Sequence, residues 1–196
     1  GICNVIYLCL LNIELERQES EGERAATFLA IEEPEAHLHP HLQRLVFRDF
    51  FEKRESVILT THSPHIVSIS PVDSFTVLRI QEDSSTGAST VNAALSPMEI
   101  SDLGRYLDAT RGELLFAKGL ILVEGDAELY LVPEIAAKMG YKLDELGITV
   151  CSVHGTDFLP YVKLVKNGAL DIPFVIATDG DPMDDNKYLS VNRVKK

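Results

Sequence analysis

One stretch of the chain constrains its fold more than any other: an apolar run headed by glycine, Gly119–Val123, that leads directly into an acidic corner. The run has the length and composition of a buried strand. Glu124 stands where the strand ends, Gly125 permits a sharp turn, and Asp126 is a good N-cap for the helix that follows. Apolar residues then recur at helical spacing as far as Met139. The stretch therefore predicts a strand, a tight corner and a helix, with carboxylates concentrated at the corner.

The carboxylates at this corner need an explanation, because neighbouring negative charges repel one another. Asp126 and Glu128 fall at the start of the predicted helix, where the helix dipole favours acids, so they can be explained without a ligand. This explanation accounts less well for Glu124, at the end of a buried strand. A divalent cation, which prefers oxygen ligands, would account for all three residues.

A second acidic corner follows a second buried-strand pattern. Pro173–Thr178 is mostly apolar and is followed by Asp179-Gly180-Asp181. Between the corners we expect a helix, a third strand at Ile148–Val153 that is followed by His154-Gly155, and a short helix at about 157–165. Such alternation is typical of a parallel sheet, whose ligands bind beyond the carboxyl ends of the strands. An isolated Asp-x-Asp is usually a solvated turn, but two acidic corners at one edge favour a site for one or two Mg²⁺ or Mn²⁺ ions, with the ligands Glu124, Glu128, Asp179 and Asp181.

These motifs resemble the Toprim domain, which is shared by topoisomerases, primases and some nucleases. LVEGDAE is followed by ATDGD, with Asp179 standing 55 residues after Glu124, and the resemblance covers Gly119 to the C-terminus. It implies that Glu124 is a general acid/base or a metal ligand, and that Asp179 and Asp181 are metal ligands. The Glu-x-x-x-Glu spacing of Glu124 and Glu128 resembles the nuclease members that use two metals.

The first part of the chain carries a different order of motifs. A strand pattern at 28–31 ends in Glu32-Glu33, EPEAHLHP leads into a helix from Pro40 to about residue 55, and a second strand pattern at 57–61 ends at His62. This order resembles the second half of an ABC-type ATPase. The resemblance implies that Glu32 supports Mg²⁺, Glu33 polarises the attacking water and His62 senses the γ-phosphate of ATP. The first acid is usually Asp in that family, so the longer Glu32 puts its direct metal contact in doubt.

No phosphate-binding loop of the form G-x-x-x-x-G-K-[ST] occurs in the sequence. With a helix predicted for residues 2–18 and no initiator Met, the chain resembles an ATPase that lacks its phosphate-binding half. We therefore expect that residues 1–196 alone do not hydrolyse ATP.

A zinc site is the weaker interpretation of three alternating histidines. His37, His39 and His41 would lie on one side of an extended segment. No cysteine lies near them, however, and polar residues are common where a helix begins.

The middle of the chain predicts a connection between two domains. Strands at 75–80 and 90–94 are expected to form a hairpin around the polar loop EDSSTGAS. Ser96 and Glu99 form a capping box for a helix to about Thr110. The expected organisation is an ATPase half at 1–95, a helical bridge at 96–118 and a C-terminally incomplete Toprim domain at 119–196.

Bulk composition limits the partners and the compartment. The net charge of −12, from 18 basic and 30 acidic residues, argues against a broad basic surface that grips DNA directly. Bound cations would reverse that charge locally. The three cysteines form no Cys-x-x-Cys and are expected to be reduced thiols of a cytoplasmic protein. No segment is long and apolar enough to predict a membrane span.

TTHSP, followed later by FAKGLILVEGDAE, resembles the OLD (overcoming lysogenization defect) family across nearly the whole chain. The implied fold class is α/β: a partial ABC-type ATPase domain followed by a Rossmann-like parallel-sheet Toprim domain. The implied activity is that of an ATP-regulated, metal-dependent DNA endonuclease of anti-phage defence or DNA repair. The resemblance further implies a homodimer or larger assembly, ATP as a ligand of the full-length protein and, in some relatives, a helicase-like partner. Two metals about 3.5–4 Å apart would then hydrolyse the phosphodiester.

Three other functions stay open at the level of sequence. The first is an ATP-driven clamp that binds DNA or a partner without cutting, with the Toprim part as a scaffold; such a scaffold would not need the acidic set. The second is a topoisomerase or primase, which would require a cleaving tyrosine in a separate domain or a polymerase context. The third is RNA as substrate, because nothing in the sequence reads a 2′-hydroxyl.

Overall fold

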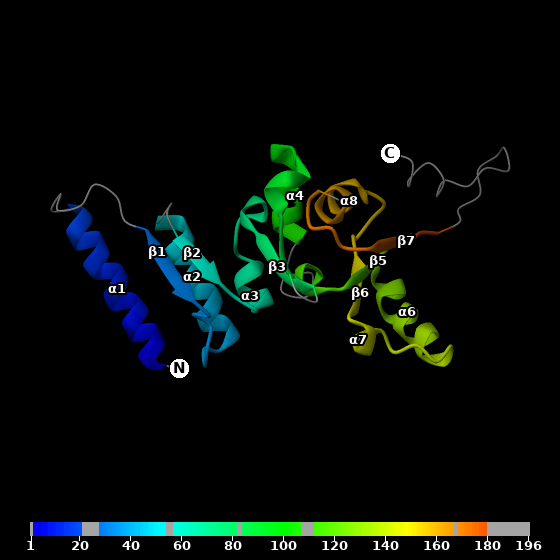
Figure 1. Cartoon of the computed structure of the whole chain (residues 1–196), viewed down its shortest axis with the longest axis horizontal. Coiled ribbons are helices and arrows are strands. Elements are labelled where there is room, and N and C mark those ends of the chain that lie inside the picture. Colours follow the sequence, from blue (N-terminus) through cyan, green and yellow to red (C-terminus); the bar gives the residue numbers. More distant parts are fainter. Residues whose placement is uncertain are drawn as a thin grey trace. The chain divides into compact units, whose positions relative to one another are not determined.

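The computed structural model describes residues 2–20, 28–53, 57–81, 84–106, 112–166 and 168–179. The chain is a mixed α/β protein that divides into two compact units, Gly1–Ser70 and Pro71–Lys196, and each unit has strands of its own (Figure 1). None of the described helices combines the length and the apolar character that crossing a membrane requires. The domain boundaries expected from the sequence stay a prediction.

The first unit is built on a parallel pair of strands. Its elements are α1 (Ile2–Ser20), β1 (Leu29–Glu32), α2 (Pro40–Lys53), β2 (Val57–Thr60) and α3 (Pro64–Val67). β1 and β2 pair in parallel from Leu29 opposite Val57 to Glu32 opposite Thr60, with α2 as the crossover helix. Strand, helix, strand and His62 therefore follow one another as the sequence predicts.

One face of this strand pair packs against the core of the first unit. That core consists of Leu8, Leu38, Phe47, Phe50 and Ile66. Side chains alternate across a strand, so Leu29 and Ile31 pack against the core while Ala30 is exposed. Because Glu32 lies opposite Thr60, the carboxyl ends of β1 and β2 are level, and the residues that follow the two strands are neighbours.

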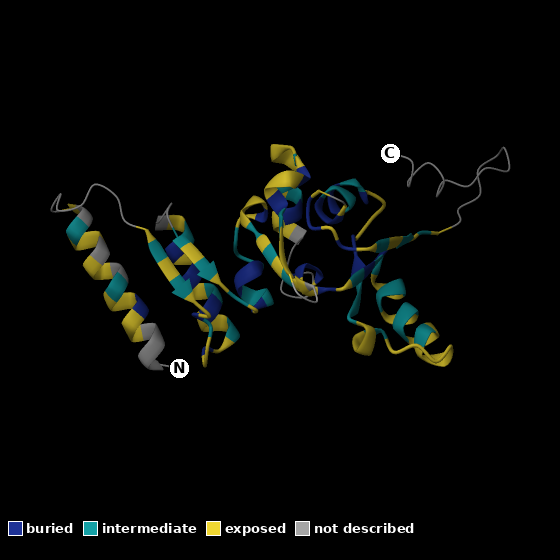
Figure 2. Ribbon diagram, viewed as in Figure 1, coloured by how far each residue is buried: buried dark blue, intermediate teal, exposed yellow. Residues whose placement is uncertain are grey.

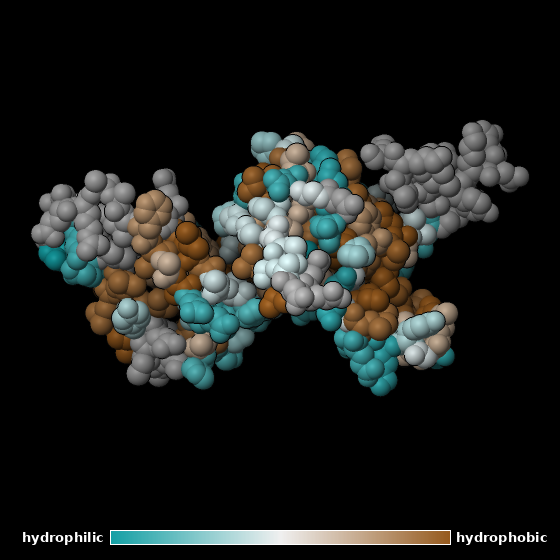
Figure 3. Space-filling model, in the orientation of Figure 1, coloured by the Kyte–Doolittle hydropathy of each residue, from teal (hydrophilic) through white to brown (hydrophobic). Residues whose placement is uncertain are grey.

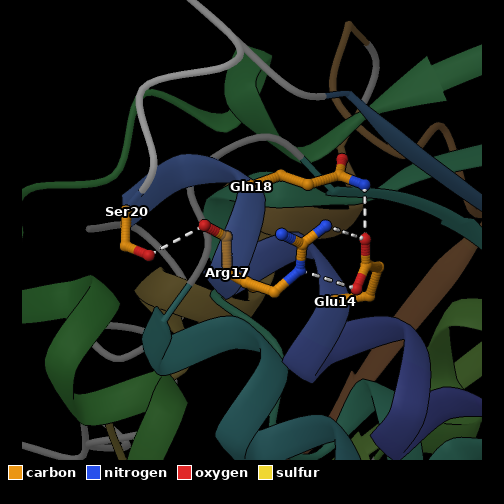
Figure 4. Close-up of polar contacts among 4 residues, drawn as sticks. All are labelled: Glu14, Arg17, Gln18 and Ser20. Carbon is orange, nitrogen blue, oxygen red and sulfur yellow. Dashed lines mark hydrogen bonds and ion pairs between the residues drawn. The ribbon is translucent and has the colours of Figure 1, made fainter.

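Helix α1 ends in a group of polar contacts (Figure 4). Arg17 donates to both carboxylate oxygens of Glu14, at 2.8 and 3.1 Å, and the Gln18 amide donates to the same carboxylate at 2.7 Å. Pairs three and four residues apart stabilise a helix modestly, which accounts for its continuation to Ser20. Exposed apolar side chains gather over the earlier turns of α1 (Figure 3), namely Ile6, Tyr7, Leu10 and Ile13.

The second unit begins with a hairpin whose second strand differs from the prediction. η1 (Val72–Ser74) precedes β3 (Thr76–Gln81), which pairs antiparallel with β4 (Ser84–Ser89), and η2 (Thr90–Ala93) follows. The predicted strand at 90–94 was wrong: the Ser/Thr/Gly segment taken for a loop forms β4. The buried Thr90 hydroxyl accepts a hydrogen bond from the Phe75 N–H at 3.0 Å, and the chain turns into η2 at this point.

A three-stranded parallel sheet forms the rest of the second unit. After α4 (Pro97–Tyr106) and η3 (Glu113–Phe116), its elements are β5 (Gly119–Val123), α6 (Asp126–Lys138), α7 (Leu143–Leu146), β6 (Ile148–Ser152), α8 (Leu159–Val165) and β7 (Phe174–Ala177). The strand order is β6-β5-β7, and both pairings are parallel. Val123 lies opposite Ser152 on one side and Ala177 on the other. All three strands therefore end at the same level, as the sequence predicts.

Burial in this unit is concentrated in α8 and the central strand (Figure 2). Leu122 of β5 and Leu164 of α8 are fully buried, whereas α6 has no buried residue. Helix α6 begins at Asp126 with Gly125 as its N-cap, one residue earlier than predicted. The extended backbone of Gly125 (φ −143°) ends the turn, so Asp126 is already helical.

An ion pair joins α4 to α8 inside the second unit. The predicted capping box is confirmed: the Ser96 N–H donates to Glu99 Oε2 at 2.7 Å, and the Glu99 N–H donates to Ser96 Oγ at 3.3 Å. Lys163 Nζ also donates to both oxygens of Glu99, at 2.7 and 2.9 Å. The hydrogen bond from Lys163, followed by that from the Ser96 backbone, holds the pKa of Glu99 below its ordinary value of 4.5.

We predict that Glu99→Gln lowers the free energy of unfolding at pH 7 by about 1–2 kcal/mol, because Gln keeps the helix cap but loses the charge that Lys163 meets. A carboxyl whose pKa is lowered in the folded state stabilises above its unfolded pKa and loses that contribution as pH falls through the folded value. Urea unfolding of the chain between pH 7 and pH 3 should therefore show a smaller loss of stability on acidification for the variant.

The matched control is Glu145→Gln, which removes the carboxylate of the exposed Lys142–Glu145 pair, whose side chains are 72% and 68% exposed. It should change stability by less than about 0.5 kcal/mol. Equal effects of the two substitutions would contradict a special role for the Glu99–Lys163 pair.

Candidate metal centre

β5 and β7 end at the same edge of the sheet, and this brings the two acidic corners together. Glu124 follows β5, and Thr178 and Asp179 follow β7. The Thr178 hydroxyl donates a hydrogen bond to Glu124 Oε1, and the Asp179 N–H donates to the same oxygen at 3.1 Å. Two residues 55 positions apart are thus joined through one carboxylate oxygen, which orients Glu124 toward the end of β7.

The end of β6 lies on the other side of Glu124. The Val153 N–H donates to the carbonyl of Val123 at 2.9 Å, and the Gly155 N–H donates to the carbonyl of Glu124 at 2.9 Å. The intervening His154 has a φ of +50°, which is uncommon for a residue with a Cβ, and Gly155 has a φ of +152°. This turn places His154 Nε2 3.6 Å from Asp126 Oδ1. Both the backbone and the side chain of Glu124 are therefore held by neighbouring strand ends.

Glu128 lies in the first turn of α6 and acts there as a cap. Its Oε2 accepts a hydrogen bond from the Gly125 N–H at 3.1 Å, which satisfies a backbone donor at the helix start. Asp181, the fourth expected ligand, lies outside the described residues. Within the described residues no three histidine, cysteine, aspartate or glutamate side chains gather closely enough to hold a metal ion.

The donor set at this edge fits a hard divalent cation. Glu124 and Asp179 offer carboxylate oxygens from two adjacent strand ends, and such oxygens are the ligands that these cations prefer. Glu124 and Asp179 would hold such an ion, whereas Glu128 is engaged in capping α6. Sequence reasoning assigned no role to Thr178; its only signal is that it immediately precedes the Asp-x-Asp motif.

The predicted ATPase residues lie at the ends of β1 and β2. Glu32 is the last residue of β1, opposite Thr60, and the Glu33 N–H donates to the Thr60 carbonyl at 3.0 Å. Glu33 takes a φ of +39°, and its Oε1 lies 3.5 Å from His62 Nε2. Both side chains are largely exposed, so the acid and the imidazole meet at an accessible strand edge.

The histidines around the start of α2 make contacts of another kind. The rings of His39 and His41 stack with centroids 5.2 Å apart. Arg44 reaches His41 Nδ1 at 2.9 Å and His65 Nδ1 at 3.2 Å. Because a guanidinium only donates, these two ring nitrogens act as acceptors from a cation. This arrangement does not favour the zinc interpretation.

Known proteins match both parts of the chain. Residues 115–181 match the family described as "Overcoming lysogenization defect protein-like, TOPRIM domain", and residues 1–67 match "AAA ATPase domain". The OLD nuclease of Thermus scotoductus is 31% identical over an alignment of 175 residues that covers 84% of this chain and 33% of that protein. The Old nuclease of Escherichia phage P2 is 25% identical over an alignment of 176 residues that covers 86% of this chain and 30% of that protein.

Among solved structures, the C-terminal region of the Burkholderia pseudomallei OLD protein is 52% identical and matches with a TM-score of 0.39 over 41% of this chain and 40% of that one. The chain spans about a third of the length of the curated relatives that it matches. The ATPase part is confirmed at the level of an AAA ATPase domain, and the Toprim resemblance is confirmed directly. The chain therefore belongs to the overcoming lysogenization defect family, as a segment in which part of an AAA ATPase domain is followed by an OLD-like Toprim domain.

Proposed function

We propose that the whole protein is an ATP-regulated, divalent-metal-dependent endonuclease that cuts DNA at the Toprim sheet edge. The observation that carries the proposal is the pair of hydrogen bonds from Thr178 and Asp179 to Glu124, which holds two acids of separate strands at one edge. Relatives whose names describe them as nucleases, including the endonuclease GajA of Bacillus cereus at 25% identity, support the same reaction class. The AAA ATPase segment supports control by ATP.

In this proposal each acid has a distinct task. Glu124 lies beside the scissile phosphate, where it binds a metal or moves the proton of the attacking water. Asp179, with Asp181 after it, and Glu128 provide the remaining oxygen ligands for Mg²⁺ or Mn²⁺. When bound, the cations supply an activated water and stabilise the leaving oxygen. They also offset the strongly negative net charge of −12 where the DNA backbone approaches.

We further propose that the protein works as a homodimer or larger assembly, because the exposed Glu33 and His62 are accessible to residues of a second copy. We also propose that the protein acts together with a helicase-like partner protein. The alternative is a clamp that binds DNA without cutting it. The metal dependence of the two functions differs: a clamp should bind DNA equally well in EDTA, whereas the nuclease should nick it only with Mg²⁺ or Mn²⁺.

The decisive variant combines Asp179→Ala with Asp181→Ala in the full-length protein. Loss of two metal ligands should reduce Mg²⁺- or Mn²⁺-supported nicking of supercoiled plasmid at least about 100-fold. The control is Asp144→Ala with Glu145→Ala on the exposed α7, which makes the same change in net charge and should nick at the wild-type rate. Unchanged nicking by the Asp179/Asp181 variant would disprove the assignment of the site.

A second variant tests the orientation of Glu124. Thr178→Val keeps the shape of the side chain but removes the hydroxyl that donates to Glu124, so the nicking rate should fall about 10-fold, while Thr178→Ser stays within about threefold of the wild type. The same change at Thr149, near the opposite end of β6, should have no effect. Equal rates for Thr178→Val and Thr149→Val would show that the hydroxyl does not position the acid.

A further inference from the structure

Glu35, which follows β1, makes two hydrogen bonds to the segment that follows β2. Its Oε1 accepts from the Thr61 hydroxyl at 2.6 Å and from the His62 N–H at 2.9 Å. Hydrogen bonds to an ionised carboxylate are about twice as strong as those between neutral groups. One oxygen of Glu35 therefore holds both the side chain that precedes His62 and the backbone of His62 itself.

These two bonds continue into a buried polar network. The Ser63 N–H donates to Thr61 Oγ1 at 3.0 Å, and the Ser63 hydroxyl donates to Gln43 Oε1 at 2.5 Å. The Gln43 amide donates to the carbonyl of Leu38 at 2.8 Å. Ser63 and Gln43 are each only 7% exposed. Glu35 Oε2 is buried without a hydrogen-bond partner in the described part of the chain, but the other bonds of this network fix the segment after β2 to α2 and to the segment after β1.

The imidazole of His62 emerges from this fixed backbone. Its side chain is 83% exposed, and its Nε2 lies 3.5 Å from Glu33 Oε1. No helix or strand fixes the backbone of His62, because β2 ends at Thr60 and α3 begins at Pro64. The bond to Glu35 is thus a contact that helps to set where the His62 backbone lies. Displacing that backbone would move the imidazole relative to Glu33.

We infer that Glu35 is a positioning residue for ATP hydrolysis, which holds His62 at its working distance from Glu33 without touching the nucleotide. This inference rests on the proposed ATP-dependent function of the whole protein. It assigns Glu35 a role different from that of the neighbouring acids Glu32 and Glu33, which are both exposed. The polar network further links the segment that includes Glu35 and Leu38 to the position of His62.

The test is steady-state ATP hydrolysis by the full-length protein and its variants. Glu35→Ala removes the acceptor of both bonds, and Thr61→Val removes one donor while keeping the shape of the side chain. Each should lower kcat about 10- to 100-fold and leave KM for ATP within about twofold, since misplacement of a group near the chemistry affects the transition state more than binding. Glu35→Gln and Thr61→Ser, which keep the hydrogen-bonding oxygens, should retain most of the turnover.

Hydrogen exchange provides a readout of the geometry that does not depend on turnover. Peptides that cover residues 60–64 should exchange faster in Glu35→Ala than in the wild type, because the His62 N–H loses its acceptor. The matched control, Glu52→Ala on the exposed side of α2, should change neither exchange nor kcat.

The outcomes separate this inference from the proposed function. Wild-type turnover together with unchanged kcat in Glu35→Ala and Thr61→Val would overturn the inference alone. Absence of ATP hydrolysis by the wild-type protein would overturn the ATP-dependent function and the inference with it. A fall in kcat that Glu35→Gln and Thr61→Ser share fully with Glu35→Ala and Thr61→Val would also contradict a positioning role.

Discussion

Parallel strand pairing at a common level is the constraint on which both candidate sites depend. In the second unit, Val123 lies opposite both Ser152 and Ala177, so the residues after all three strands emerge at one edge. In the first unit, Glu32 lies opposite Thr60, and the residues after two strands emerge together. Backbone hydrogen bonds fix these registers. Residues that are far apart along the chain, such as Glu124 and Asp179, therefore lie close together because of strand pairing alone.

Carboxylates at these edges have two kinds of role. Some are engaged by backbone or hydroxyl donors of the protein, as Glu124 is by Thr178 and Asp179, and Glu35 by Thr61 and His62. Others are largely exposed, as Glu33 is. Engagement fixes where a carboxylate lies, whether that carboxylate is a proposed metal ligand, as Glu124 is, or positions another residue, as Glu35 does. The same residue type thus serves both to organise a site and to supply its chemistry.

Much of the fold could be predicted because its local signals agree. Gly119–Val123 is a strand with the predicted bounds, and Ser96 and Glu99 form the predicted capping box. The prediction failed at β4, where Ser84–Ser89 has no apolar alternation and nevertheless pairs antiparallel with β3. It also placed the N-cap of α6 one residue late, because Gly125 provides the turn without a capping side chain. Backbone geometry determines both the strand β4 and the start of α6, and the pattern of apolar and polar side chains does not predict that geometry.

The sequence alone determined the residue types, the spacing of the acidic corners, and the membership of a family with an ATPase part and a Toprim part. It did so because strands, turns and helix starts are set by interactions between near neighbours. Only the tertiary structure decided that Thr178 holds Glu124 and that Glu35 reaches His62. Each of these depends on a hydrogen bond between chain segments whose relative positions are fixed only once the strands have paired and packed.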